Sequence, residues 1–176
     1  MRFARLVVIS LAILFVLLTI IGLFMPSSVT VGRSAEIDAP VDSVRFYTND
    51  LSRWRLWLNG ADTAYYKQLT PGTSGESSQI KLGSYNITVI KNDPKYIITL
   101  WQGEHTGEQV SRIELYYNSA NSTAVNWSFE QQLKWYPWER LTAMLHDKIF
   151  GPSMEASLYK LKQVVEKRQI TSQITE

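Results

Sequence analysis

The sequence contains no cysteine, and only two of its 176 residues are histidine. Without cysteine, the chain can form no disulfide, no thiolate zinc site and no iron–sulfur cluster, and it has no thiol nucleophile. A metal site built on His105 or His146 would need carboxylate ligands, and no short spacing of His, Asp and Glu supplies them. We therefore expect neither a metal ion nor any other cofactor.

An excess of charge of one sign is also missing. The chain has 18 basic and 16 acidic residues, and no run of basic residues is longer than Lys167-Arg168. Proteins that bind nucleic acid usually carry a concentrated basic stripe, so we expect no nucleic-acid partner. The composition is 45% hydrophobic and 12% aromatic, which indicates a folded core. The length allows one domain and an appendage.

The motifs of common catalytic sites are absent as well. No Gly-x-Ser-x-Gly elbow occurs, and no glycine-rich phosphate loop follows a strand and opens a helix. His105 lies in a predicted hairpin connection, and His146 lies beside the apolar stripe of a predicted helix. These patterns identify no catalytic residue.

One long apolar run stands near the N-terminus. Residues 6–24 are 19 consecutive residues without a charged side chain. As a helix they would be roughly 28 Å long, close to the thickness of the hydrocarbon core of a bilayer. A cleaved signal peptide has a shorter apolar region of about 7–15 residues and a small-x-small cleavage site, which residues 24–28 do not provide. We predict an uncleaved transmembrane anchor over 6–25, ended by Pro26.

The flanking charges predict the orientation of this anchor. Arg2 and Arg5 precede the run, whereas the next basic residue, Arg33, comes well after it. Positive flanks stay in the cytoplasm, so residues 1–5 are expected inside and the rest outside. In a bacterium this places a domain over residues 26–170 in the periplasm, attached to the inner membrane by a single span, with residues 171–176 as a flexible tail.

Hydrophobic periodicity predicts the elements of that domain. Alternation over 28–37 is typical of a strand, with Arg33 as the exception on its apolar side. Two short helices are expected over 41–49 and 51–58. Turn residues and period-two patterns then predict six more strands, over 64–69, 79–82, 85–91, 96–102, 110–117 and 124–131.

The chain ends in a predicted long helix. Its apolar residues recur at helical spacing, and Gly151-Pro152 is expected to kink or break it. One curved antiparallel sheet of about seven strands wrapped over one long helix is the arrangement that this order favours, an α+β fold. The apolar helix positions are Leu141, Met144, Leu145, Ile149, Met154, Leu158, Leu161 and Val165.

Several local motifs resemble the START-like, helix-grip superfamily, specifically its polyketide cyclase/dehydrase or SRPBCC proteins. The resemblance covers roughly residues 26–168, and some bacterial members also begin with an apolar helix. The matching pieces are the strand 29–37 running into Asp38-Ala39-Pro40-Val41, the short-helix motif over 49–57, the late strand with Val125-Asn126-Trp127, and the end of the long helix over 158–162.

The resemblance implies an elongated cavity between the sheet and the long helix. Inward strand residues and the facing side of the helix would line it, and Trp54 and Trp57 would close one end. The same residues would serve equally well as an ordinary packed core. The other candidates for the lining are Ile113, Leu115, Tyr117, Val125, Trp127, Phe129, Leu141, Met144, Leu145 and Ile149.

Three functions follow from these expectations. The first is a membrane-anchored module that binds a hydrophobic small molecule or lipid, supplied by the bilayer beside it. The second is an enzyme like the cyclases and aromatases of the superfamily, which shape a reactive chain with few catalytic side chains. The third is an interaction domain without a cavity. An aromatic surface patch formed by Trp135, Tyr136 and Trp138 would favour this function.

Overall fold

A computed structural model of the chain describes residues 2–24, 27–104, 107–133 and 136–174, with the side chains of residue 2, residues 137–146 and residues 170–174 left out. The elements follow one another in the order expected for an α+β domain behind an apolar helix. They are α1 (Arg2–Leu23), β1 (Ser28–Ile37), α2 (Val41–Thr48), the 3-10 helix η1 (Leu51–Leu56), β2 (Tyr66–Gln68), β3 (Gln79–Leu82), β4 (Tyr85–Asp93), β5 (Tyr96–Gly103), β6 (Gln109–Ser119), β7 (Ser122–Gln132) and α3 (Pro137–Ile174).

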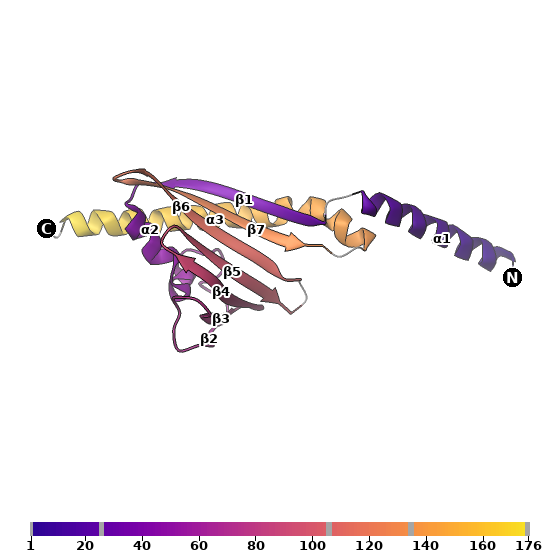
Figure 1. The fold of residues 1–176 in the computed structure, drawn as a ribbon, viewed down its shortest axis with the longest axis horizontal. Coiled ribbons are helices and arrows are strands. Elements are labelled where there is room, and N and C mark those ends of the chain that lie inside the picture. The colour runs from indigo at the N-terminus through magenta and orange to yellow at the C-terminus, as the bar shows by residue number, and fades with distance from the viewer. Residues whose placement is uncertain (1, 25–26, 105–106, 134–135, 175–176) are drawn as a thin grey trace.

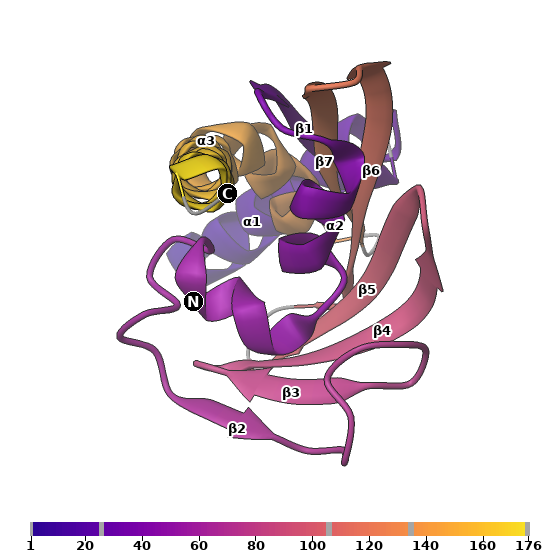
Figure 2. The ribbon, with the colours of Figure 1, turned by 90° about the vertical axis from the view of Figure 1, so that its left-hand side faces the viewer.

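All seven strands form one antiparallel sheet in the order β1-β7-β6-β5-β4-β3-β2. Six of the strands follow one another as a meander, and β1 joins the last of them at the edge. Figure 2 shows the sheet curving around α2, η1 and α3, which all lie on its concave side. The expected helix-grip architecture is therefore confirmed.

The helix α3 is one continuous element, although Pro152 lies inside it. Its first turns lean away from the axis of the remainder (Figure 1), so the helix bends, and Gly151-Pro152 does not break it. Proline removes one backbone hydrogen bond, but burial of the apolar stripe holds the helix on the sheet. The residues of that stripe, all 3% exposed or less, are Met154, Leu158, Leu161 and Val165.

The side chain of Asp50 organises the short segment that carries two core tryptophans. Its Oδ1 accepts hydrogen bonds from the backbone N–H of Ser52 at 3.0 Å and from the hydroxyls of Ser52 and Thr73, both at 2.7 Å. Asp50 therefore caps η1 and ties it to the loop before β3. Burial acts to raise the pKa of Asp50, but these hydrogen bonds together with the charge of Arg53 lower it below its ordinary value.

Trp54 and Trp57 are fully buried under the concave face of the sheet. The indole N–H of Trp54 donates to the carbonyl of Thr48 at 2.8 Å, and that of Trp57 donates to the carbonyl of Tyr47 at 3.1 Å. Both acceptors lie in the last turn of α2. The two rings thus fill the core without leaving a polar atom unpaired, and they fix η1 against α2.

Arg33, the polar residue on the inner side of β1, reaches across to α3. Its guanidinium contacts Asp147 at 2.8 Å and Glu155 at 2.7 Å, and it lies over Gly151, where a larger residue would collide with it. The three helix residues are spaced four apart and so share one face. The hydrogen bond from Arg33 lowers the pKa of Asp147 below its ordinary value. Because both carboxylates are exposed, this contact mainly positions the helix and adds little stability.

The helix α1 projects from the domain (Figure 1) and buries little of its surface. Residues Phe3–Leu23 have a mean hydropathy of 3.1. Among the described residues, this is the one helix that is long and apolar enough to cross a membrane. Length and composition are shared by membrane anchors and by signal sequences near an N-terminus. The structure therefore shows an N-terminal apolar helix of membrane-spanning length.

Replacing the capping aspartate tests the account of η1. Asp50→Ala should lower the free energy of unfolding by about 0.5–2 kcal/mol at neutral pH, the usual effect of losing a helix cap. Because the native pKa of Asp50 is lowered, its contribution is present at neutral pH and is lost as the pH falls through that native value. Denaturant titration of the full chain in detergent at neutral and acid pH measures both effects.

The matched control is Asp42→Ala, which removes an exposed aspartate whose one ion pair among the described residues is with Arg45, one turn along α2. This variant should lose less than about 0.5 kcal/mol. An equal loss in the two variants, or a loss at Asp50 that does not shrink at acid pH, contradicts the capping role.

Candidate functional site

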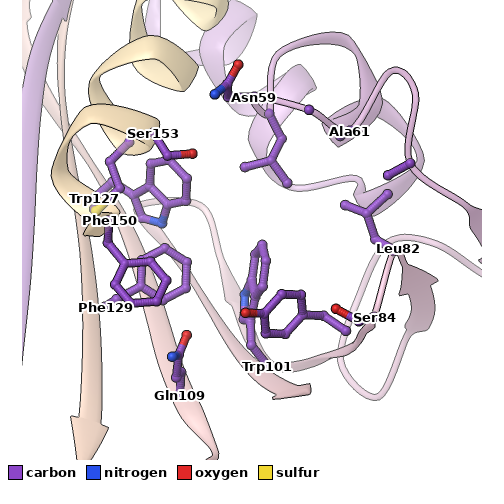
Figure 3. A pocket seen from close by; sticks show the side chains of 16 residues that line it. Asn59, Ala61, Leu82, Ser84, Trp101, Gln109, Trp127, Phe129, Phe150 and Ser153 are labelled. Carbon is purple, nitrogen blue, oxygen red and sulfur yellow. The ribbon is translucent and has the colours of Figure 1, made fainter. Parts of the chain in front are cut away.

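A cavity of about 290 Å³ lies between the concave face of the sheet and α3. Its walls come from the segment after η1, the turn between β3 and β4, three central strands and the middle of α3, and Figure 3 shows these side chains converging on one space. The volume is just below the range of about 300–1,000 Å³ that is typical of small-molecule sites. The lining residues are Leu58, Asn59, Gly60, Ala61, Ala64, Leu82, Gly83, Ser84, Tyr85, Trp101, Gln109, Trp127, Phe129, Phe150, Ser153 and Met154.

Aromatic rings make up much of the wall. Phe129 of β7 lies at its centre, with ring centroids 5.2 Å from Trp101, 5.2 Å from Trp127 and 6.4 Å from Phe150 of α3. Tyr85 continues the row at 5.6 Å from Trp101. Edge-to-face and offset contacts of this kind hold each ring in one orientation, so the wall is rigid.

The tryptophans of this wall present carbon and not nitrogen to the cavity. The indole N–H of Trp101 donates to Thr99 at 3.0 Å, and the indole N–H of Trp127 donates to Ser111 at 2.8 Å. Because both acceptors lie on the neighbouring inner positions of the sheet, the polar atoms of the rings are satisfied inside the protein. The rings therefore offer apolar surface to whatever occupies the space.

Few polar groups reach the cavity, and almost none of them titrates. Asn59, Ser84, Gln109 and Ser153 contribute neutral polar side chains. Tyr85 is the only titratable residue among the described ones that line it. General acid–base catalysis needs a proton donor or acceptor with a pKa near the working pH, and the described lining supplies no such pair. The described residues also contain no group of three or more metal-binding side chains.

The structure places two of the expected lining residues, Trp127 and Phe129, in the wall of this cavity. Trp54 and Trp57 do not close its end; they stand behind the wall, 5.9 Å from Trp101 and 5.6 Å from Trp127 respectively. Three further candidates are buried in the core and do not line the cavity: Ile113, Leu115 and Val125.

Two other candidates lie away from the cavity. Tyr117 is 72% exposed, because it stands where the register of β6 with β7 shifts, next to their connecting turn. Ile149 is 62% exposed. Upstream of Met154, the inward face of α3 continues through Phe150, and the neighbouring position 149 points about 100° away from it. The side chains of Leu141, Met144, Leu145, His146 and Trp138 lie outside the described residues, as do residues His105 and Trp135 as a whole.

Sequence reasoning missed several members of the wall. Trp101 stands on the inner face of β5, two residues after the inner positions Ile97 and Thr99. Gln109 stands on the inner face of β6, two residues before the inner positions Ser111 and Ile113. Extending each alternation by two residues therefore finds both. Phe150 follows from the stripe of Met154 counted back by four residues. No pattern in the sequence identifies the residues of the segment after η1.

The cavity lies toward the end of the sheet at which α1 joins the domain. Ser28, the first residue of β1, pairs with Gln132 of β7. Gln131 of β7 pairs with Gln109 of β6, one strand further along. Gln109 in turn pairs with Trp101, so the same end continues across β5. Lining residues of β5 and β6 thus stand at the end of the sheet from which the apolar helix departs.

Comparison with known families matches residues 28–166 to the family described as polyketide cyclase/dehydrase and lipid transport. The match begins with β1 and ends within α3, so it spans most of the domain behind α1. No curated protein matches the chain by sequence.

Solved structures share the fold over most of the chain. A START superfamily protein from Mycobacterium smegmatis has a TM-score of 0.63 at 17% identity, covering 79% of this chain and 98% of that one. The Zhui aromatase/cyclase from Streptomyces sp. R1128 has a TM-score of 0.64 at 13% identity, covering 80% and 95%. A protein from Nitrosospira multiformis has a TM-score of 0.61 at 16% identity, covering 79% and 99%. At these identities the likeness establishes the fold and not the activity.

Proposed function

The chain belongs to the polyketide cyclase/dehydrase and lipid transport family, and on that premise we propose that it is a membrane-anchored module that binds a hydrophobic small molecule or lipid in the cavity between sheet and α3. The observation that carries the proposal is the ring-lined cavity itself. A packed domain would fill this space with its own side chains, as protein interiors usually do.

The chemistry of the lining supports binding more than catalysis. Burying roughly 200 Å² of apolar ligand surface there would contribute about 5 kcal/mol before the cost of association, without any polar catalyst. The described lining holds no carboxylate, imidazole or amine that could take up or release a proton. The cyclase activity of the Zhui protein belongs to that protein, and no residue of this cavity argues for transferring it.

The position of the cavity gives the apolar helix a role. In the proposal α1 spans the inner membrane with its N-terminus in the cytoplasm and the domain outside, as Arg2 and Arg5 favour. Only four residues separate Leu23 from Ser28, and an extended stretch of four spans at most about 14 Å. The end of the sheet with Trp101 and Gln109 is thereby held close to the bilayer surface, and a ligand dissolved in the bilayer is available at high local concentration.

Filling the cavity tests the binding proposal. Native mass spectrometry of the full chain, released from detergent after gentle purification, should show an added mass that disappears on denaturation. Ala64→Phe introduces a ring into the wall, so the bound fraction should fall by at least about tenfold, because no room remains for the ligand.

The matched control is Ala120→Phe, the same substitution in the exposed turn between β6 and β7 at the opposite end of the sheet. It should leave the added mass unchanged. A wild-type chain that carries no adduct, even after incubation with a membrane lipid extract, contradicts the binding proposal and favours the interaction domain instead.

Separating the domain from the helix tests the supply route. A flexible Gly/Ser insert of about 20 residues after Phe24 lets the domain move roughly 25 Å from its anchor. In vesicles containing a diazirine-tagged hexadecanol, photolabelling of cavity peptides should fall at least about threefold, while labelling of α1 stays the same.

The same insert placed between Ala120 and Asn121, in the turn at the far end of the sheet, should leave cavity labelling at the wild-type level. Equal labelling in the chain with the insert after Phe24 would show that the ligand reaches the cavity through water, and it would remove the role assigned to the anchor.

A further inference from the structure

Gln109 is a polar residue on the apolar, inner face of β6. It is 4% exposed, and it precedes the inner positions Ser111, Ile113 and Leu115. Figure 3 shows its side chain at the base of the cavity, directed into the space between Phe129 and Trp101. A buried amide among aromatic rings is costly unless each of its polar atoms is hydrogen-bonded.

The other buried polar side chains of the described domain are paired within the protein. Hydroxyl groups in this set donate to a backbone carbonyl or a side-chain oxygen, or accept from an indole N–H, at 2.7–3.1 Å. These residues are Thr48, Ser78, Thr99, Ser111, Thr123 and Ser157. The interior therefore satisfies its polar groups consistently, and a departure from that rule indicates a site.

Gln109 departs from the rule at one atom. Its Nε2 donates to Oε1 of Gln131 on the neighbouring strand at 3.1 Å, which fixes the orientation of the amide. Its own Oε1 accepts no hydrogen bond from any described residue, and it points into the cavity (Figure 3). The carbonyl oxygen of Gln109 is thus a positioned acceptor in an apolar surround.

We infer that the carbonyl oxygen of Gln109 receives a hydrogen bond from a hydroxyl group on the ligand, which is otherwise apolar and carries a planar ring. This inference rests on the proposed binding function and adds the chemical class of the ligand. The ring is expected because Trp101, Phe129 and Phe150 offer ring faces and edges against which a planar group packs best. A charged ligand does not fit, because the described lining contains no ionised partner.

A pair of probes that differ in one donor tests the inference. The probes are 2-naphthol and its methyl ether, 2-methoxynaphthalene, which keeps the ring and the oxygen but loses the O–H. Calorimetric titration of the full chain in lipid nanodiscs, corrected with empty discs, should give about three- to tenfold tighter binding of the naphthol. Gln109→Met, which has a similar length and no acceptor oxygen of this kind, should reduce that preference to about one.

The control is Phe150→Leu, which removes ring contact but leaves the amide in place. It should weaken both probes to a similar extent and preserve the preference for the naphthol. A preference that survives in Gln109→Met, or that is absent from the wild-type chain although both probes bind, overturns the inference while the binding function stands. Failure of both probes to bind the wild-type chain overturns the inference together with the proposed cavity function.

Discussion

The width of the sheet is the constraint on which the rest of the structure depends. Seven strands make a sheet roughly 29 Å wide, whereas a helix with its side chains is about 10–12 Å across. The long helix α3 packs mainly along β1, so it leaves much of the apolar face to be covered. The sheet curls, and α2 and η1 lie over its middle (Figure 2). The buried side chains of Trp54 and Trp57 fill the space beneath them. The cavity lies between that face and α3, where α2 and η1 do not fill the space.

This geometry explains why the cavity is both rigid and apolar. Trp101 and Trp127 form part of the wall, Trp54 and Trp57 stand behind them, and the N–H groups of all four donate to protein oxygens, so the rings are held in place. Arg33 holds α3 at β1 across Gly151, close to the point where Phe150 enters the cavity. A space of this kind selects a ligand by shape and by apolar surface. Its place near the end of the sheet that joins α1 agrees with a ligand drawn from a bilayer.

Periodicity in the sequence was sufficient to predict the fold, because strands buried on one face alternate strictly and the stripe of α3 repeats at helical spacing.

The wall of the cavity was harder to predict. Ile149 was assigned to the stripe and Phe150 was not, since a shift of one residue on a helix turns a side chain by about 100°. Tyr117 continues the alternation of β6 in the sequence, but it lies beyond the part of the sheet that the helices cover. Gln109 was missed because a polar residue at the first position of a strand is easily assigned to the preceding loop. Whether apolar residues enclose a space or fill it depends on packing in three dimensions, which no one-dimensional pattern records.

A crystal structure of the full chain, grown from a lipidic mesophase, tests the central claim most directly. The account predicts ordered non-protein density against Phe129, Trp101 and Phe150, with the carbonyl oxygen of Gln109 within hydrogen-bonding distance of it. Side chains collapsed into the space, with Gln109 paired to another protein group and no room for a ligand, would contradict the account.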